Sequence, residues 1–334
     1  MSAARRKAIS DGLAAFAAQA SSPKPLQILY STKPNWPGKD VSGGGGSGAA
    51  TKPAGLDIAV LDSSFNPPTK AHAALALSSP VRAAAIDKGS SSSSAARKGA
   101  YDAHLLLFSV RNADKGTGKA GDASTVQRLE MMHLLAHDVE ARLRDEDREA
   151  SVAVALVEEP LMIAKSTLIH QYLGPAASAQ TSLHWVVGMD TLERFFQVKY
   201  YPSPRFFEDA CGQFFEKERT RFVCARRGPE SLPNSDKARA GGSSSDDEDK
   251  FLRSDPVARW LDCGSVAIID LPAEAQGISS TAVRSLASAL EEGKQAGTAT
   301  EEELKRLTTP SIAKYLIDES VYQPPKKQED SSTS

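Results

Sequence analysis

Short apolar runs recur along the chain, and segments with the spacing of amphipathic helices lie between them. Six runs have the composition of β-strands: 57–61, 103–110, 151–157, 182–187, 220–225 and 265–270. Several of them, such as LLLFSV, LHWVV and VAIID, are almost continuously hydrophobic, as expected for strands that are covered on both faces. We expect helices near the N-terminus and at 125–144, 204–218, 280–292, 301–307 and 310–318.

The order of these elements predicts the fold. Strands that alternate with helices indicate a parallel sheet with helices on both sides. We therefore expect an α/β fold built on a doubly wound parallel sheet, with an N-terminal helix before it and C-terminal helices after it. Ligands of such sheets bind beyond the carboxyl ends of the strands, near the point where the strand order reverses. Polar residues that directly follow a strand are therefore candidates for a site.

Composition separates the folded part of this 334-residue chain from segments that cannot form a core. The stretches 42–52, 83–100 and 227–250 are poor in large apolar residues, so burial cannot offset the entropy of ordering them. The expected division is an N-terminal helical segment at 1–30, a domain at 55–322 with insertions near 83–100 and 227–250, and a disordered tail at 323–334.

Charge and cysteine content narrow the class of protein. The 40 basic and 42 acidic residues leave a net charge of −2, which provides no overall attraction to nucleic acid or to a membrane. Cys211, Cys224 and Cys263 lack the spacing of a zinc site or a disulfide framework, which favours a reducing compartment. His133 and His137 share a helix face, but no third ligand is near them in sequence, so we expect no metal site. The expected location is the cytoplasm, with the nucleus as a second possibility.

A first candidate site follows the first predicted strand, where the sequence reads SSFNPPTKAH from Ser63 to His72. Pro68 suits the start of a helix, because a missing N–H is harmless there. Thr69 and His72 are three positions apart and share one face of the first turn. Free N–H groups, a hydroxyl and an imidazole at a helix start indicate phosphate chemistry. An isolated T-x-x-H would more often be a helix cap beside an unrelated histidine, but the preceding strand and Ser-Phe-Asn-Pro turn favour a site.

A second candidate site follows the last predicted strand, where the sequence reads GISSTAVR from Gly277 to Arg284. Ser280, Thr281 and Arg284 can present hydroxyls and a guanidinium to one anion. The alternative is a well-capped helix with an exposed arginine. Between the two sites, Gly188 gives room for a ligand and the carboxylate of Asp190 can accept hydrogen bonds from ligand hydroxyls; a glycine turn with Asp190 capping a helix at 191–197 is equally plausible.

The two motifs resemble those of the nucleotidyltransferase superfamily, [H/T]-x-G-H and I-S-S-T-x-x-R, and in particular the nicotinamide and nicotinate mononucleotide adenylyltransferases. This family often carries G-S-F-N-P before the first motif. Here Ser63 stands at the position of that glycine and Ala71 at the glycine of the motif, and both narrow the room for phosphate beside the backbone. The segment FFQVKYYP at 195–202 is similar to a divergent fungal branch of the family.

The resemblance implies a Rossmann-like nucleotidyltransferase fold and a reaction. It implies transfer of the adenylyl group of ATP, used with Mg²⁺, to nicotinamide mononucleotide or nicotinate mononucleotide, giving NAD and pyrophosphate. The acceptor phosphate is already anionic and attacks the α-phosphorus in line, so no strong general base is needed. His72 would donate to the α-phosphate, Thr69 would position the phosphates, and Arg284 would hold the β- and γ-phosphates.

The same resemblance assigns the binding residues. They are Ser64, Phe65, Thr69, His72, Lys115, Gly188, Asp190, Ser280, Thr281 and Arg284, with no protein ligand to a metal. Two alternatives remain open. One is a cytidylyltransferase-like enzyme with another phosphorylated acceptor, although the Ser-Phe-Asn-Pro turn favours the pyridine-nucleotide branch. The other is a nucleotide-binding regulator or weak ATPase on the same fold, which Ser63 and Ala71 support and the intact His72 and Arg284 oppose.

Overall fold

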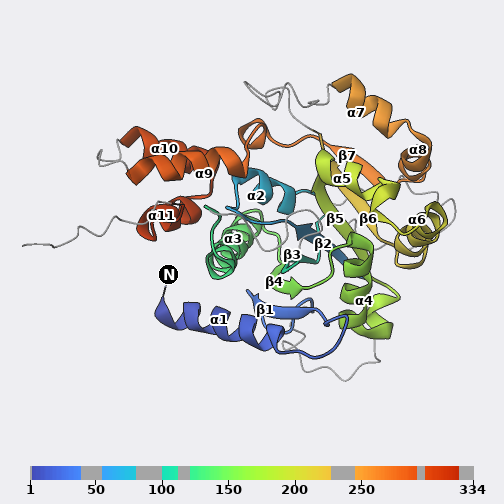
Figure 1. Ribbon diagram of the computed structural model, residues 1–334, viewed down its shortest axis with the longest axis horizontal. Coiled ribbons are helices and arrows are strands. Elements are labelled where there is room, and N and C mark those ends of the chain that lie inside the picture. Colours follow the sequence, from blue (N-terminus) through green and yellow to red (C-terminus); the bar gives the residue numbers. More distant parts are fainter. Residues whose placement is uncertain are drawn as a thin grey trace, which may run out of the picture.

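The fold is organised around one central sheet (Figure 1). The computed structural model describes residues 2–38, 55–79, 100–111, 121–226, 245–291 and 298–322. Its seven strands are β1 Gln27–Ser31, β2 Asp57–Asp62, β3 Ala103–Ser109, β4 Ser151–Val157, β5 Ser182–Gly188, β6 Arg221–Ala225 and β7 Val266–Ile269. They lie in the order β1-β4-β3-β2-β5-β6-β7. All neighbours are parallel except β1, which pairs antiparallel with β4 at the edge.

Without the edge strand β1, this order is the one that defines doubly wound dinucleotide-binding sheets. The helices on one face are α1 Ala3–Ala17, α2 Lys70–Ala76 and α3 Thr125–Asp145. The other face is covered by α4 Met162–Ser178, α5 Met189–Phe195, α6 Pro204–Cys211, α7 Ser245–Leu252 and α8 Asp255–Asp262. The expected fold class is therefore confirmed.

The C-terminal helices form a third group beside α3 (Figure 1). They are α9 Ser280–Ser288, α10 Thr298–Leu307 and α11 Pro310–Asp318, and their apolar side chains share a small core with Met131 of α3. The expected N-terminal helix is α1, so helices at both ends of the domain are confirmed as well.

Burial on both faces explains the hydrophobic strands. In β2, Ile58 and Val60 belong to the core on one face of the sheet, whereas Ala59 and Leu61 belong to the core on the other. None of the four is more than 3% exposed. Burial of an aliphatic side chain of this size contributes about 1.5–3 kcal/mol, so the strand is held strongly from both sides.

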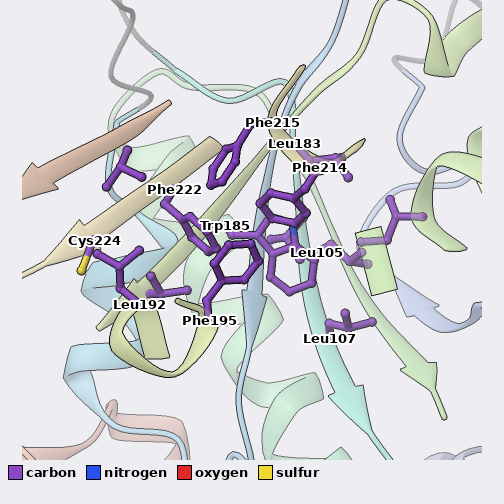
Figure 2. Close-up of a cluster of buried hydrophobic side chains, with 14 of the residues drawn as sticks. Leu105, Leu107, Leu183, Trp185, Leu192, Phe195, Phe214, Phe215, Phe222 and Cys224 are labelled. Carbon is purple, nitrogen blue, oxygen red and sulfur yellow. The ribbon is translucent and has the colours of Figure 1, made fainter. Parts of the chain in front are cut away.

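Aromatic packing holds the end of α5, the short helix that directly follows β5. Phe195 of α5 packs against Phe222 of β6 and Phe214, with ring centroids 4.8 and 5.0 Å apart (Figure 2). Trp185 of β5 lies in the same cluster and is fully buried. Large rigid side chains therefore hold both the strand before Gly188 and the helix after it in place.

The structure also departs from the sequence-based expectations. Strand β1 and helices α4 and α8 were not predicted. The helix expected at 204–218 is α6 followed by a π-helical turn, Gly212–Lys217. The last residues of the insertion expected near 227–250 belong to helix α7. The described residues do not include 227–244, most of 83–100, all of 42–52 or the tail at 323–334, so the predictions for these segments stay predictions. Among the described residues, no helix is both long and apolar enough to cross a membrane.

Candidate active site

The strand order places the first motif at the switch point of the sheet. Strands β2 and β5 are hydrogen-bonded neighbours, but α2 leaves β2 toward one face and α5 leaves β5 toward the other. The turn that follows β2 and Gly188 at the end of β5 therefore emerge side by side. This is where doubly wound sheets bind their ligands.

Helix capping fixes the imidazole of His72. Thr69 is the N-cap of α2, and its backbone N–H donates to Nδ1 of His72 over 3.1 Å. In many helices, a glutamate or glutamine at the third helical position accepts this hydrogen bond from the backbone N–H of the N-cap residue. Here the imidazole of His72 accepts it and so completes the cap. Because a backbone N–H can only donate, Nδ1 is an acceptor, and the proton of the neutral ring lies on Nε2. The Thr69 hydroxyl, 2.9 Å from Nδ1, is then a donor to the same atom.

The other ring nitrogen of His72 faces Ser63. Nε2 lies 2.9 Å from Ser63 Oγ, and both side chains are half-buried. Burial lowers the pKa of His72 to about 4, because the imidazolium would lose its hydration. The imidazole is therefore neutral at pH 7 and acts as a hydrogen-bond donor through Nε2.

Asn66 organises the turn between β2 and α2. Its buried Oδ1 accepts from the backbone N–H of Ala123 at 3.1 Å and from the Tyr322 hydroxyl at 2.8 Å. Its Nδ2 donates to Asp122 Oδ1 at 2.6 Å. Phe65, which precedes it, has a φ of 45° and a fully buried ring. The turn is thus fixed by partners from two distant parts of the chain.

Helix α9 docks directly on this turn. Arg284 Nη1 donates to the backbone carbonyl of Asn66 at 2.6 Å, although 218 positions separate the two residues. Ser280 Oγ donates to the carbonyl of Pro67 at 2.8 Å, and Arg284 Nη2 donates to Thr281 Oγ1 at 3.0 Å. The half-buried guanidinium retains further N–H groups for an anion. The structure therefore joins the two motifs in one place.

Lys165 is a residue of this region that the sequence did not indicate. It lies on α4, is only 5% exposed, and places Nζ 2.5 Å from Oδ2 of Asp62, the last residue of β2. The buried ion pair holds the strand end that leads into Ser63. A crossover helix between the parallel strands β4 and β5 was foreseeable, but no local pattern links Lys165 to Asp62.

The remaining predicted residues take varied positions. Ser64 is half-buried in the turn, whereas the Phe65 ring belongs to the core. Gly188 is the N-cap of α5, and the exposed Asp190 lies within the first turn of that helix, so the alternative in which Asp190 caps a helix at 191–197 is wrong. Lys115 lies outside the described residues. Within the described ranges, no cluster of three or more His, Cys, Asp or Glu residues could hold a metal ion.

Gly188→Ala tests whether this position faces a ligand. A Cβ built on Gly188 meets no protein atom within 4 Å, and its φ of −89° suits alanine. We expect stability to change by less than about 1 kcal/mol, because the restriction of the unfolded chain by alanine is offset by the loss of a residue that is favoured at a helix N-cap. ATP affinity should fall, since the added methyl would occupy ligand space. Thermal unfolding and calorimetric titration with ATP measure the two effects.

Gly55→Ala is the matched control for that substitution. Its Cβ would lie 2.3 Å from the carbonyl oxygen of Gln180, so stability should fall while the ATP affinity of the folded protein stays unchanged. If Gly188→Ala leaves ATP affinity unchanged, the nucleotide does not approach this turn.

Fold and site together define an α/β protein of the doubly wound class, with its candidate site at the switch point of the sheet. No protein-family model matches the chain. Over 144 residues, the chain is 33% identical to a Schizosaccharomyces pombe protein provisionally named nicotinamide mononucleotide adenylyltransferase. The matched segment is 43% of this chain and 44% of the relative, so the chain spans less than half of that relative's length. This similarity confirms the resemblance to the mononucleotide adenylyltransferases.

Solved structures give a more distant likeness. A Plasmodium falciparum nicotinic acid mononucleotide adenylyltransferase complexed with NaAD matches 80% of this chain and 97% of its own, with 13% identity and a TM-score of 0.42. A Vibrio parahaemolyticus protein provisionally named nicotinate-nucleotide adenylyltransferase matches 80% of this chain and 95% of its own, with 13% identity and a TM-score of 0.31. The strand order of the chain itself defines its fold.

Proposed function

We propose that the chain transfers the adenylyl group of ATP to nicotinamide mononucleotide, giving NAD and pyrophosphate. The proposal is carried by the contact between the two motifs, because Arg284 and Ser280 of α9 rest on the carbonyls of Asn66 and Pro67 beside His72. The name of the Schizosaccharomyces pombe relative supports the same reaction. The cytoplasm remains the proposed location, with the nucleus as the alternative.

The site suits a reaction that depends on alignment and charge neutralisation. The acceptor phosphate is anionic near neutral pH and can attack the α-phosphorus of ATP without a general base, and the neutral His72 is not placed to act as one. Donors at the switch point stabilise charge that builds on the phosphoryl oxygens. Arg284 is placed to hold the β- and γ-phosphates. Mg²⁺ would enter as part of the MgATP substrate, bridging phosphate oxygens.

An assay of the purified full chain tests the proposal. MgATP is supplied with nicotinamide mononucleotide or nicotinate mononucleotide, and dinucleotide and pyrophosphate are quantified together. We expect equal amounts of both products, with the nicotinamide form preferred. Pyrophosphate release only with CTP and phosphocholine would indicate a cytidylyltransferase. Slow orthophosphate release that no acceptor changes would indicate a weak ATPase.

Arg284→Ala should weaken the use of ATP mainly through KM. Hydrogen bonds to charged groups contribute about 1.5–3 kcal/mol, which corresponds to roughly a tenfold to hundredfold rise in KM for ATP. The KM for the acceptor should change little. Steady-state kinetics with each substrate varied in turn measure both values.

Arg306→Ala is a suitable control, because Arg306 is an exposed residue of α10 that pairs with Glu303. It should leave both KM values unchanged. A rise in the acceptor KM alone in Arg284→Ala would place the guanidinium on the other substrate.

A further inference from the structure

The Ser63 hydroxyl occupies the outer end of a directed chain of hydrogen bonds. The chain begins at the backbone N–H of Thr69, which donates to Nδ1 of His72. It continues from Nε2 of His72 to Ser63 Oγ over 2.9 Å. Because Nε2 carries the proton, Ser63 Oγ accepts this bond, and its own proton is left to point at another acceptor.

The direction of these bonds excludes one role for Ser63. A serine nucleophile needs a histidine nitrogen without a proton, which takes the hydroxyl proton during attack. Nδ1 of His72 is occupied by two donors and Nε2 is protonated, so the imidazole cannot activate Ser63 in this way. The geometry suits donation through the hydroxyl instead.

The position of Ser63 points that donation toward the ligand. Ser63 directly follows the end of β2 at the switch point, is half-buried, and precedes the turn on which Arg284 docks. The similar adenylyltransferases often have glycine here, which has no side chain to accept a hydrogen bond from the imidazole N–H. In this chain the Ser63 hydroxyl already accepts that hydrogen bond.

We propose that the Ser63 hydroxyl donates to the α-phosphate of bound ATP, while His72 positions and polarises this hydroxyl without contacting the phosphate itself. The inference rests on the proposed nucleotide site. Successive hydrogen bonds polarise one another, so a hydroxyl that accepts from the imidazole is a stronger donor than an isolated serine. Ser63 is then the catalytic residue, and His72 is a positioning residue.

Kinetics of Ser63→Ala, His72→Ala and the double variant test this relay. Because both residues act in series, each single variant should lose kcat by roughly a hundredfold, and the double variant should be no more than about threefold worse than either. The KM for ATP should stay within about twofold, which a general loosening of the site would not produce. Ser288→Ala, at the far end of α9, is the control and should match the wild type. Normal or faster turnover in Ser63→Ala, with His72→Ala still inactive, would overturn the relay.

Phosphorus NMR of bound ATP separates the relay from the transferase activity. Without acceptor, the α-phosphorus signal should move by the same amount in Ser63→Ala and the double variant, because both remove the donor. In His72→Ala it should move in the same direction, because the hydroxyl loses the imidazole that positions and polarises it. If this pattern appears but no acceptor is adenylylated, the relay stands and the proposed transfer is wrong. If transfer occurs but Ser63→Ala leaves the α-phosphorus signal unchanged, the transfer stands and the relay is wrong. Failure to bind ATP would overturn both.

Discussion

Replacing His72 with alanine should lower kcat by roughly a hundredfold or more, because it removes the imidazole that supports the donor to the charge developing on the α-phosphate. ATP affinity should change much less, since Arg284 and the turn at Asn66 are left in place. The neutral imidazole, with a pKa lowered to about 4, should also leave kcat independent of its ionisation across pH 6–8. Single-turnover rates and equilibrium ATP binding measure the two effects.

Two variants separate chemistry from folding in this experiment. His72→Gln keeps a side chain that can accept from the Thr69 N–H and preserve the helix cap, so it should be as stable as the wild type but remain impaired. His137→Ala, on the exposed side of α3, should be fully active. Near-normal turnover in His72→Ala would show that the imidazole has no part in the reaction.

Replacing Lys165 with methionine should produce the largest loss of stability. The substitution leaves the carboxylate of Asp62 without its buried ammonium partner, and breaking such a pair destabilises a protein by about 3–5 kcal/mol. The midpoint of urea unfolding should fall accordingly. Because Asp62 leads into Ser63, the surviving folded fraction should also bind ATP less well.

A double variant and a surface pair provide the comparison. Asp62→Asn combined with Lys165→Met removes both charges and should recover part of the lost stability. Lys314→Met breaks an exposed pair with Asp318 and should change stability by no more than about 1 kcal/mol. An equally small effect at Lys165 would show that water reaches the buried pair.

Much of the fold could be predicted because buried strands form nearly continuous hydrophobic runs in the sequence. The six predicted strands match the observed bounds within a residue or so, since both of their faces must be apolar. Strand β1 was not predicted because all five of its residues are half-buried at an antiparallel edge. Its sequence therefore shows no alternation of apolar and polar positions. Helix α4 begins without a side-chain cap and is broken by Gly174, with a φ of 74°, and Pro175, so its helical period is short.

The site could be predicted only as far as its local motifs reach. The residues around His72 and Arg284 were found because each group lies within one turn of a helix. The contacts that define the geometry are long-range: Lys165 with Asp62, and Tyr322 with Asn66, join residues with no shared pattern. The Ser63 contact with His72 depends on which ring nitrogen the Thr69 N–H occupies, and the sequence does not state this.

The side chain of Asn66 sets an order of events during synthesis. Its side chain bonds to Asp122 and to the backbone of Ala123, which are made early. Its backbone carbonyl accepts from Arg284 and its side-chain oxygen accepts from Tyr322, and both of these partners are made much later. Ribosomes add residues from the N-terminus, and earlier segments fold first. A nascent chain can therefore build most of the sheet while the turn at Asn66 is still incomplete. The turn is completed only after the final helices have left the ribosome, so under the proposed function partly made chains should not consume ATP.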